Sequence, residues 1–136
     1  MPDPAADAVV LDASALVEAL LGTGVGLNVR QRMRGAALHA PAHLDAEVLS
    51  ALGRLHRAGD LPPEAVSARL RELAAAPIAR HALAGLLADA WQARDRFRLV
   101  DALYIALCEQ LGLRLLTTDA RLARESELAD LITSPS

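Results

Sequence analysis

Lysine and aromatic residues are almost missing from this sequence. All 14 basic residues are arginine, and the aromatic set is Trp91, Phe97 and Tyr104, or 2% of the 136 residues. So few rings exclude a stacking platform for single-stranded nucleic acid, which needs several exposed aromatic side chains. The basic groups are instead planar, forked donors that suit phosphates and carboxylates. The core must be built from leucine, alanine and valine.

Cysteine and long apolar runs are also scarce. The single cysteine, Cys108, cannot form an internal disulfide, so a reducing compartment is expected. No apolar run reaches the roughly 18 residues that a membrane-spanning helix needs. Residues 1–7 contain two prolines and two aspartates where a signal peptide would have a basic and then an apolar region. We therefore expect a cytoplasmic protein.

The charge and length point to one acidic, well-packed unit. A net charge of −3 excludes a globally basic nucleic-acid binder, although a local basic face is still open. With 53% hydrophobic residues, the chain can bury a sizeable core. We expect a single domain over residues 1–136, with its core at about 8–133 and short flexible ends.

Short apolar runs alternate with longer segments of helical spacing. The strand candidates are 8–11, 36–40, 77–82, 114–117 and 131–133. The helix candidates are 13–21, 27–34, 43–57, 62–75, 83–95, 99–111 and 120–123, and glycine-rich 22–26 is expected to be a loop. This alternation predicts an α/β fold with a parallel sheet and helices on both faces.

Three acids stand where predicted strands end. Asp12 directly follows 8–11, Asp119 follows 114–117, and Glu47 lies in the helix after the second strand. In an open parallel sheet, ligands bind at the carboxyl ends of the strands. We therefore expect these side chains to meet at one edge of the sheet, although they are far apart in the sequence.

A fourth acid, Asp101, lies in an apolar helix. A carboxylate in such surroundings needs a partner or a metal ion. If the four acids stand about 5 Å apart, each pair repels by roughly 3 kcal/mol at an effective dielectric of about 20. Protons or a divalent cation must then neutralise them, and oxygen ligands suit Mg²⁺ or Mn²⁺. Such a site is equipped for phosphodiester hydrolysis.

Each acid also has a purely structural interpretation. Asp12 and Asp119 can cap the helices that follow them, and Glu47 can be a favourable acid of a first helical turn. Asp101 is the hardest to explain in this way, because its neighbours are apolar. The metal hypothesis therefore rests on the set and not on any one residue.

Four segments, one around each acid, resemble the acidic motifs of PIN-domain proteins, and in particular those of VapC-type toxins of bacterial toxin–antitoxin pairs. They read VVLDASALV at 9–17, PAHLDAEV at 41–48, VDALYIAL at 100–107 and LTTDARL at 116–122. The resemblance implies a three-layer α/β/α PIN-like fold with a mainly parallel, roughly five-stranded sheet. It also implies an endoribonuclease that depends on Mg²⁺ or Mn²⁺ and cleaves RNA with a metal-activated water.

The resemblance also assigns roles to residues and partners. Asp12, Glu47, Asp101 and Asp119 would be the catalytic, metal-binding acids, with Ser14 and Thr118 as supporting hydroxyls. The partners implied are RNA, a second copy of the chain in a homodimer, and a cognate VapB-type antitoxin whose C-terminal segment blocks the acidic cleft. Two departures stand out: Val100 replaces an aromatic residue found in many relatives, and Ala120-Arg121 stands where some families have a further acid.

Other signals leave alternatives open. Arg94, Arg96 and Arg98 can hold RNA phosphates at the rim of the cleft, or they can simply form a solvated turn. The alternative functions are a PIN-like RNA-processing nuclease outside any toxin system and a non-catalytic binding module with the same fold. A neighbouring reading frame that encodes an antitoxin distinguishes a toxin from an RNA-processing nuclease. Binding of Mn²⁺ distinguishes a metal-dependent nuclease from a non-catalytic binding module.

Overall fold

The computed structural model describes residues 7–135, so the expected flexible ends fall largely on residues 1–6 and 136, outside the described part. Within that part, five strands form one sheet in the order β3-β2-β1-β4-β5, and every neighbouring pair is parallel. The strands are β1 (Ala8–Leu11), β2 (Ala37–Pro41), β3 (Ile78–His81), β4 (Leu115–Thr117) and β5 (Ala129–Leu131). The predicted parallel sheet is confirmed.

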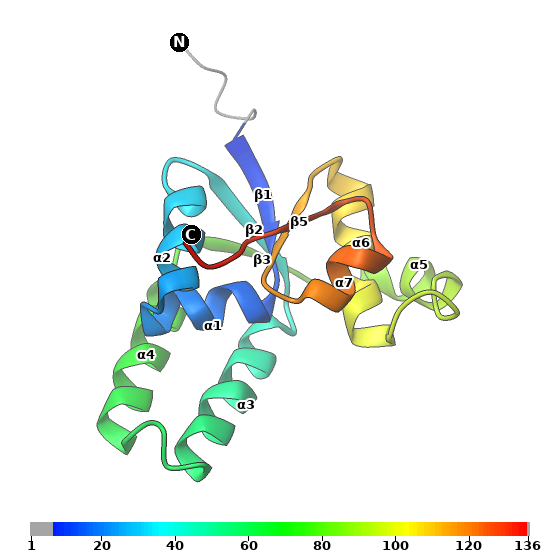
Figure 1. Ribbon diagram of the computed structural model, residues 1–136. Coiled ribbons are helices and arrows are strands. Elements are labelled where there is room, and N and C mark those ends of the chain that lie inside the picture. The colour runs from blue at the N-terminus through cyan, green and yellow to red at the C-terminus, as the bar shows by residue number, and fades with distance from the viewer. Residues whose placement is uncertain (1–6, 136) are drawn as a thin grey trace.

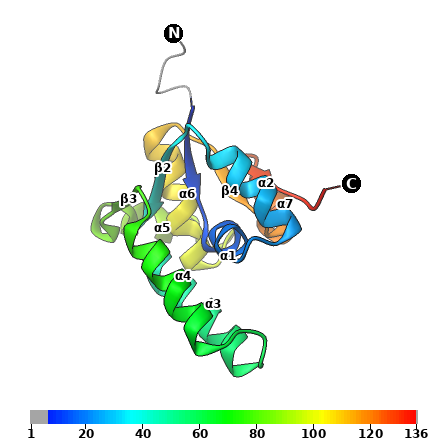
Figure 2. The same ribbon diagram turned by 90° about the vertical axis from the view of Figure 1, so that its left-hand side faces the viewer.

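Helices cover both faces of this sheet. They are α1 (Ala13–Leu21), α2 (Gly24–Met33), α3 (Leu44–Arg57), α4 (Pro63–Ala75), η2 (Leu83–Leu86), α5 (Leu87–Gln92), α6 (Leu99–Leu111) and α7 (Ala120–Glu125). Helix α6 packs on the sheet with η2 and α5 against it, while α1, in contact with α2, α3 and α4, covers the other face (Figures 1 and 2). The predicted three-layer α/β/α architecture is therefore confirmed.

The core lies between α6, the central strands and α1. Val10 and Leu11 of β1 and Leu115 and Leu116 of β4 are fully buried. All residues of α6 from Asp101 to Cys108 are also buried, since this helix contacts the sheet on one side and α5 and η2 on another. No helix among residues 7–135 is long and apolar enough to cross a membrane.

The parallel direction of the strands brings the starts of several helices to one edge of the sheet. A single residue, Asp12, separates β1 from α1, and α7 begins shortly after β4. Helices α3 and α4 form an antiparallel pair that projects past this carboxyl edge (Figure 1). Side chains from α1, α3 and α6 can therefore face a common space.

The prediction for the glycine-rich segment 22–26 was wrong in its extent. Only Gly22 and Thr23 lie between helices, because α2 begins at Gly24 and not at residue 27. Gly22 ends α1 with a φ of +68°, and the Thr23 hydroxyl caps α2 by accepting from the Gly26 N–H at 3.0 Å. This local capping outweighs the low helix propensity of glycine.

Two further boundaries differ from the prediction. The expected helix 83–95 is divided into the 3₁₀ turn η2 and the short helix α5, which ends at Gln92. The last strand is Ala129–Leu131 and not 131–133, because its backbone pairs with Leu115–Thr117 of β4. At a sheet edge the hydrogen-bond register fixes the strand, and the most apolar residues need not lie within it.

Candidate active site

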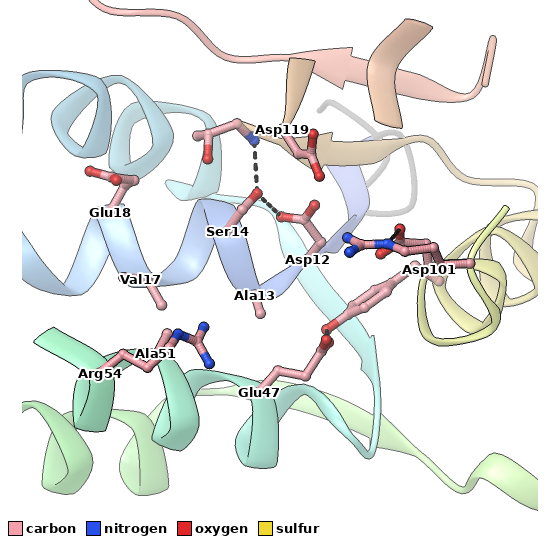
Figure 3. A pocket seen from close by; sticks show the side chains of 13 residues that line it. Asp12, Ala13, Ser14, Val17, Glu18, Glu47, Ala51, Arg54, Asp101 and Asp119 are labelled. Atoms are coloured by element: carbon pink, nitrogen blue, oxygen red, sulfur yellow. Dashed lines mark hydrogen bonds and ion pairs between the residues drawn. The ribbon is translucent and has the colours of Figure 1, made fainter. Parts of the chain in front are cut away.

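A cleft of about 310 Å³ opens at the carboxyl edge of the sheet, between α1, α3, α6 and the start of α7. All four acids predicted from the sequence line it and lie around a common space (Figure 3). Ser14 and Thr118, the predicted supporting hydroxyls, line it as well. The complete lining is Asp12, Ala13, Ser14, Val17, Glu18, Glu47, Ala51, Arg54, Arg98, Asp101, Tyr104, Thr118 and Asp119.

Asp12 is held by a dense set of hydrogen bonds. Its Oδ1 accepts from the Ser14 hydroxyl at 2.7 Å and from the Ala15 N–H at 2.9 Å, which also makes it the N-cap of α1. Its Oδ2 accepts from the Thr117 hydroxyl. The Ser14 hydroxyl in turn accepts from the Thr118 N–H at 3.1 Å (Figure 3). The carboxylate of Asp12 thus both caps α1 and forms part of the cleft.

Burial dominates the electrostatics of Asp12. The residue is only 5% exposed, and this burial raises the pKa of its carboxyl group to about 6, although hydrogen bonds from Thr117, Ala15 and Ser14 act in the opposite direction. The negative charge of Asp119 contributes to the raised pKa. A carboxyl group in this state gains strongly from a nearby positive charge.

Glu47 reaches the cleft from the first turn of α3. Its Oε1 accepts from the Tyr104 hydroxyl of α6 at 2.7 Å and lies 3.4 Å from Nε2 of His43. The His43 and Tyr104 rings pack against each other, with 4.7 Å between their centroids. Burial, followed by the bond to Glu47, raises the pKa of Tyr104, so this phenol stays a hydrogen-bond donor. Glu47 is therefore fixed in position by the opposite wall.

Asp101 is paired with two arginine side chains, as expected for a carboxylate in apolar surroundings. It is 8% exposed, and its Oδ2 accepts from Arg98 Nε at 3.2 Å and from Arg121 Nη2 at 2.9 Å. Asp119 caps α7 by accepting from the Arg121 N–H at 2.9 Å and the Leu122 N–H at 3.3 Å. The same Arg121 guanidinium lies 3.2 Å from Asp119 Oδ2.

The donor set fits a hard divalent cation, although the side chains are not closed around one. Within residues 7–135, no three acidic, histidine or cysteine side chains are grouped closely enough to hold a metal ion as they stand. The cleft nevertheless presents five carboxylates, the four predicted acids and Glu18 of α1, and no sulfur or imidazole ligand, which is the chemistry that Mg²⁺ and Mn²⁺ prefer. Two guanidinium groups balance part of this negative charge at Asp101.

Comparison with known proteins agrees with this geometry. The PIN domain family model matches residues 9–128. Ribonuclease VapC3 of Mycobacterium tuberculosis is 55% identical over 124 residues, which span 90% of both chains. This chain belongs to the PIN-domain family of VapC ribonucleases. Ribonuclease VapC12 of the same species is 37% identical over 116 residues, or 85% of this chain and 90% of that protein.

Solved structures show the same PIN fold at low sequence identity. VapC20 of Mycobacterium tuberculosis, described as a toxin that cleaves the sarcin–ricin loop, superposes with a TM-score of 0.66 at 16% identity. That match covers 93% of this chain and 99% of VapC20. A protein of Pyrobaculum aerophilum also gives a TM-score of 0.66, at 24% identity, over 89% of this chain and 81% of its own.

The three arginines considered as RNA contacts of this PIN domain are not all at the cleft. Of the three RNA-contact candidates only Arg98 lines the cleft. Arg94 lies over the Trp91 ring at 4.6 Å, and Arg96 lies over the Phe97 ring at 5.0 Å. Arg54, in the last turn of α3, also lines the cleft.

Sequence reasoning missed the residues that hold the acids of the PIN site. Thr117, Tyr104 and Arg121 make side-chain contacts to Asp12, Glu47 and Asp101, respectively. A usable signal existed for Tyr104, because it lies three residues after Asp101 and thus on the same side of a helix. Thr117 could be found only from the register of β1 against β4, in which Leu11 pairs with Leu116.

Proposed function

We propose that this chain is the toxin of a toxin–antitoxin pair and hydrolyses RNA phosphodiesters at the acidic cleft. The observation that carries the proposal is the convergence of Asp12, Glu47, Asp101 and Asp119 on one cleft, in a chain 55% identical to a ribonuclease. These four acids come from separate elements that only the fold brings together.

We further propose that the four carboxylates hold Mg²⁺ or Mn²⁺, as is typical of PIN-domain VapC ribonucleases. When bound, such a cation would lower the pKa of a water molecule and stabilise negative charge on the phosphate. The raised pKa of buried Asp12 supports this role, because the ionised carboxylate lacks a positive counter-charge of its own. A hydrolysis of this kind proceeds without a covalent intermediate on the protein.

The surrounding residues would keep the acids oriented during the reaction. Ser14 and Thr117 donate to Asp12 from two sides, so its oxygens face the cleft in one orientation. Tyr104 does the same for Glu47. Since the donors are packed in rotamers fixed by α1, β4 and α6, little reorganisation is needed when substrate binds.

Two arginines are suited to hold the RNA backbone. Arg98 and Arg54 line opposite parts of the cleft, from the start of α6 and from the last turn of α3. Guanidinium groups bind phosphate oxygens through paired hydrogen bonds and position a nucleic acid without reading its sequence. This local basic rim would let a protein of net charge −3 bind a polyanion.

The partners proposed are a VapB-type antitoxin and a second copy of the chain. An antitoxin that blocks the acidic cleft would prevent RNA from reaching the four carboxylates. For the homodimer, support comes from exposed apolar side chains on α5 and at the start of α6, two helices that contact each other. Leu87, Trp91, Leu99 and Val100 are 57%, 55%, 48% and 47% exposed.

The test is RNA cleavage by the purified protein with and without chelator. We expect cleavage with Mg²⁺ or Mn²⁺, none with EDTA, and products without a 2′,3′-cyclic phosphate, because water and not the ribose 2′-hydroxyl attacks phosphorus. Products with a 2′,3′-cyclic phosphate, or undiminished cleavage in EDTA, would overturn the mechanism. Absence of both cleavage and Mn²⁺ binding would favour a non-catalytic binding module.

A further inference from the structure

Arg121 does not itself line the acidic cleft, but it contacts two of the acids that do. Its Nη2 lies 2.9 Å from Asp101 Oδ2 and 3.2 Å from Asp119 Oδ2, so one nitrogen bridges two of the four acids. Arg98 contacts Asp101 alone, through Nε at 3.2 Å. Among the described residues, Arg121 is therefore the cation that links acids from two different elements.

The same guanidinium has a second anionic partner outside the cleft. Its Nη1 lies 3.1 Å from Glu125 Oε2, one turn further along α7. Glu125 does not line the acidic cleft but a separate hollow with Arg124 and Ser126. Because the Arg121 and Glu125 side chains are 36% and 33% exposed, a shift of the guanidinium toward Glu125 meets little packing resistance.

Asp119 keeps its position without the Arg121 side chain. Its Oδ1 is fixed by the backbone N–H groups of Arg121 and Leu122 in the cap of α7. Its Oδ2, the atom that faces the guanidinium, takes no part in that cap. Movement of Arg121 would therefore free an oxygen that is already in place.

From this geometry we propose that Arg121 is an internal counter-cation, which neutralises Asp101 and Asp119 in the metal-free protein and turns to Glu125 when a divalent cation binds. The inference rests on the proposed metal-dependent function. The Arg121 guanidinium and a divalent cation would compete for the carboxylates of Asp101 and Asp119, so the affinity measured for the metal would be reduced by the fraction of molecules in which Arg121 occupies them. Arg121 thereby sets the metal concentration at which the site is loaded.

The test is calorimetric titration of Mn²⁺ into the full-length protein and four variants. Arg121→Ala removes the competitor, and we expect Mn²⁺ to bind about tenfold more tightly. Glu125→Ala removes the alternative partner, which leaves the guanidinium on the acids and weakens Mn²⁺ binding. Arg124→Ala is the matched control, because it removes an equal charge from an exposed position on the same helix.

The double variant Arg121→Ala/Glu125→Ala separates exchange from simple charge effects. If the Arg121 guanidinium moves between the two acids and Glu125, the Glu125 substitution has no further effect once Arg121 is removed. The double variant then binds Mn²⁺ with the same affinity as Arg121→Ala. Additive effects of the two substitutions, or an Arg121→Ala affinity equal to that of Arg124→Ala, would overturn the proposal.

Two outcomes keep the proposal separate from the function on which it rests. If the wild-type protein binds Mn²⁺ and Arg121→Ala binds it no more tightly than Arg124→Ala, the exchange is wrong while the metal site stands. If neither wild type nor any variant binds Mn²⁺, both are wrong. Should Arg121→Ala not fold, unchanged Mn²⁺ affinity in Glu125→Ala, whose substitution lies outside the cleft, still contradicts the exchange.

Discussion

Asp12 is the most deeply buried acid of the cleft. It is nearly fully buried, and its pKa is raised to about 6, mainly by loss of solvent. Between its unfolded and folded pKa values, such a carboxyl group holds more protons in the folded state. Its contribution to the free energy of unfolding therefore falls as the pH rises through this window.

Asp12→Asn should relieve this effect in the metal-free protein. We expect the free energy of unfolding of Asp12→Asn, relative to wild type, to increase by about 1 kcal/mol between about pH 5 and about pH 7. Urea denaturation in EDTA at several pH values measures the difference, with exposed Asp60→Asn as the control for loss of one charge. A difference in the free energy of unfolding that does not change with pH would contradict the raised pKa of Asp12.

Thr117, which sequence reasoning passed over, makes more contacts than its neighbour Thr118. Its fully buried hydroxyl donates to Asp12 and accepts from the Asp119 N–H at 3.0 Å. Thr117→Val should lower the free energy of unfolding by about 1–3 kcal/mol, because it leaves buried polar groups without partners. Chemical denaturation measures this loss.

Thr118→Val is the matched control for stability. The Thr118 side chain forms no hydrogen bond within residues 7–135, and its backbone N–H, which valine retains, donates to Ser14. We expect a change within about 0.5 kcal/mol. Equal destabilisation by the two substitutions would mean that the hydroxyl of Thr117 has no special part in holding the site.

At the scale of elements, the junction of α1 and α2 depends on Gly26. A Cβ at this position would lie 1.9 Å from the backbone oxygen of Glu18 in α1, which cannot move independently of its helix. Gly26→Ala should therefore lower the free energy of unfolding by about 2 kcal/mol, as overpacking of a close contact does. Thermal unfolding of the variant checks this value.

Gly53→Ala provides the contrasting substitution within a helix. The nearest atom to a Cβ at Gly53 is Arg57 Nη1, at 3.6 Å, at the end of a flexible side chain. Alanine then brings only its better helix propensity, and we expect stabilisation by about 0.5–1 kcal/mol. If Gly26→Ala were as harmless as Gly53→Ala, the two helices would not need to approach as closely as described.

Elements were predictable where local sequence and burial agree. The range of α6 was predicted to the residue, because a long apolar run ends at Gly112, which adopts a φ of +67°. The start of α2 was not predictable from glycine content, since the Thr23 cap decides it. The position of β5 depends on its pairing with β4, which leaves no local pattern.

The acids of the candidate site were predictable for the same reason that the sheet was. Asp12 and Asp119 follow strands, and parallel strands bring their ends to one edge. The contacts of Arg121 were not predictable, because they depend on how α7 lies against α6. The positions of the acids in the sequence therefore predict that they gather at one edge of the sheet. Which arginine pairs with which acid depends on the side-chain geometry and was not predictable.

At the scale of the whole molecule, exposed apolar side chains on α5 support the proposed homodimer. Leu87 on α5 is 57% exposed, beside Trp91 at 55% on the same helix. If the proposed homodimer forms through α5, Leu87→Ser should shift the protein from dimer to monomer in light scattering, because an apolar contact of the interface is lost. Leu27→Ser, at a leucine 54% exposed on α2, should leave the mass unchanged.

The outcome of this pair decides whether α5 takes part in the dimer. A dimer that persists in Leu87→Ser, or one that is lost equally in Leu27→Ser, would contradict the assignment of the interface to α5 and the start of α6. A wild-type protein that is monomeric at all concentrations would contradict the homodimer itself.

The central claim is that acids from separate elements form one reactive site. Single-turnover RNA cleavage at limiting Mn²⁺ by wild type, Asp12→Asn, Asp101→Asn and the exposed control Asp60→Asn tests it most directly, with circular dichroism to verify folding. We expect both cleft variants to lose more than about 100-fold in rate, since loss of a group that merely orients a ligand already costs roughly 10- to 100-fold. Asp60→Asn should match wild type. Full activity in either folded cleft variant would contradict the account.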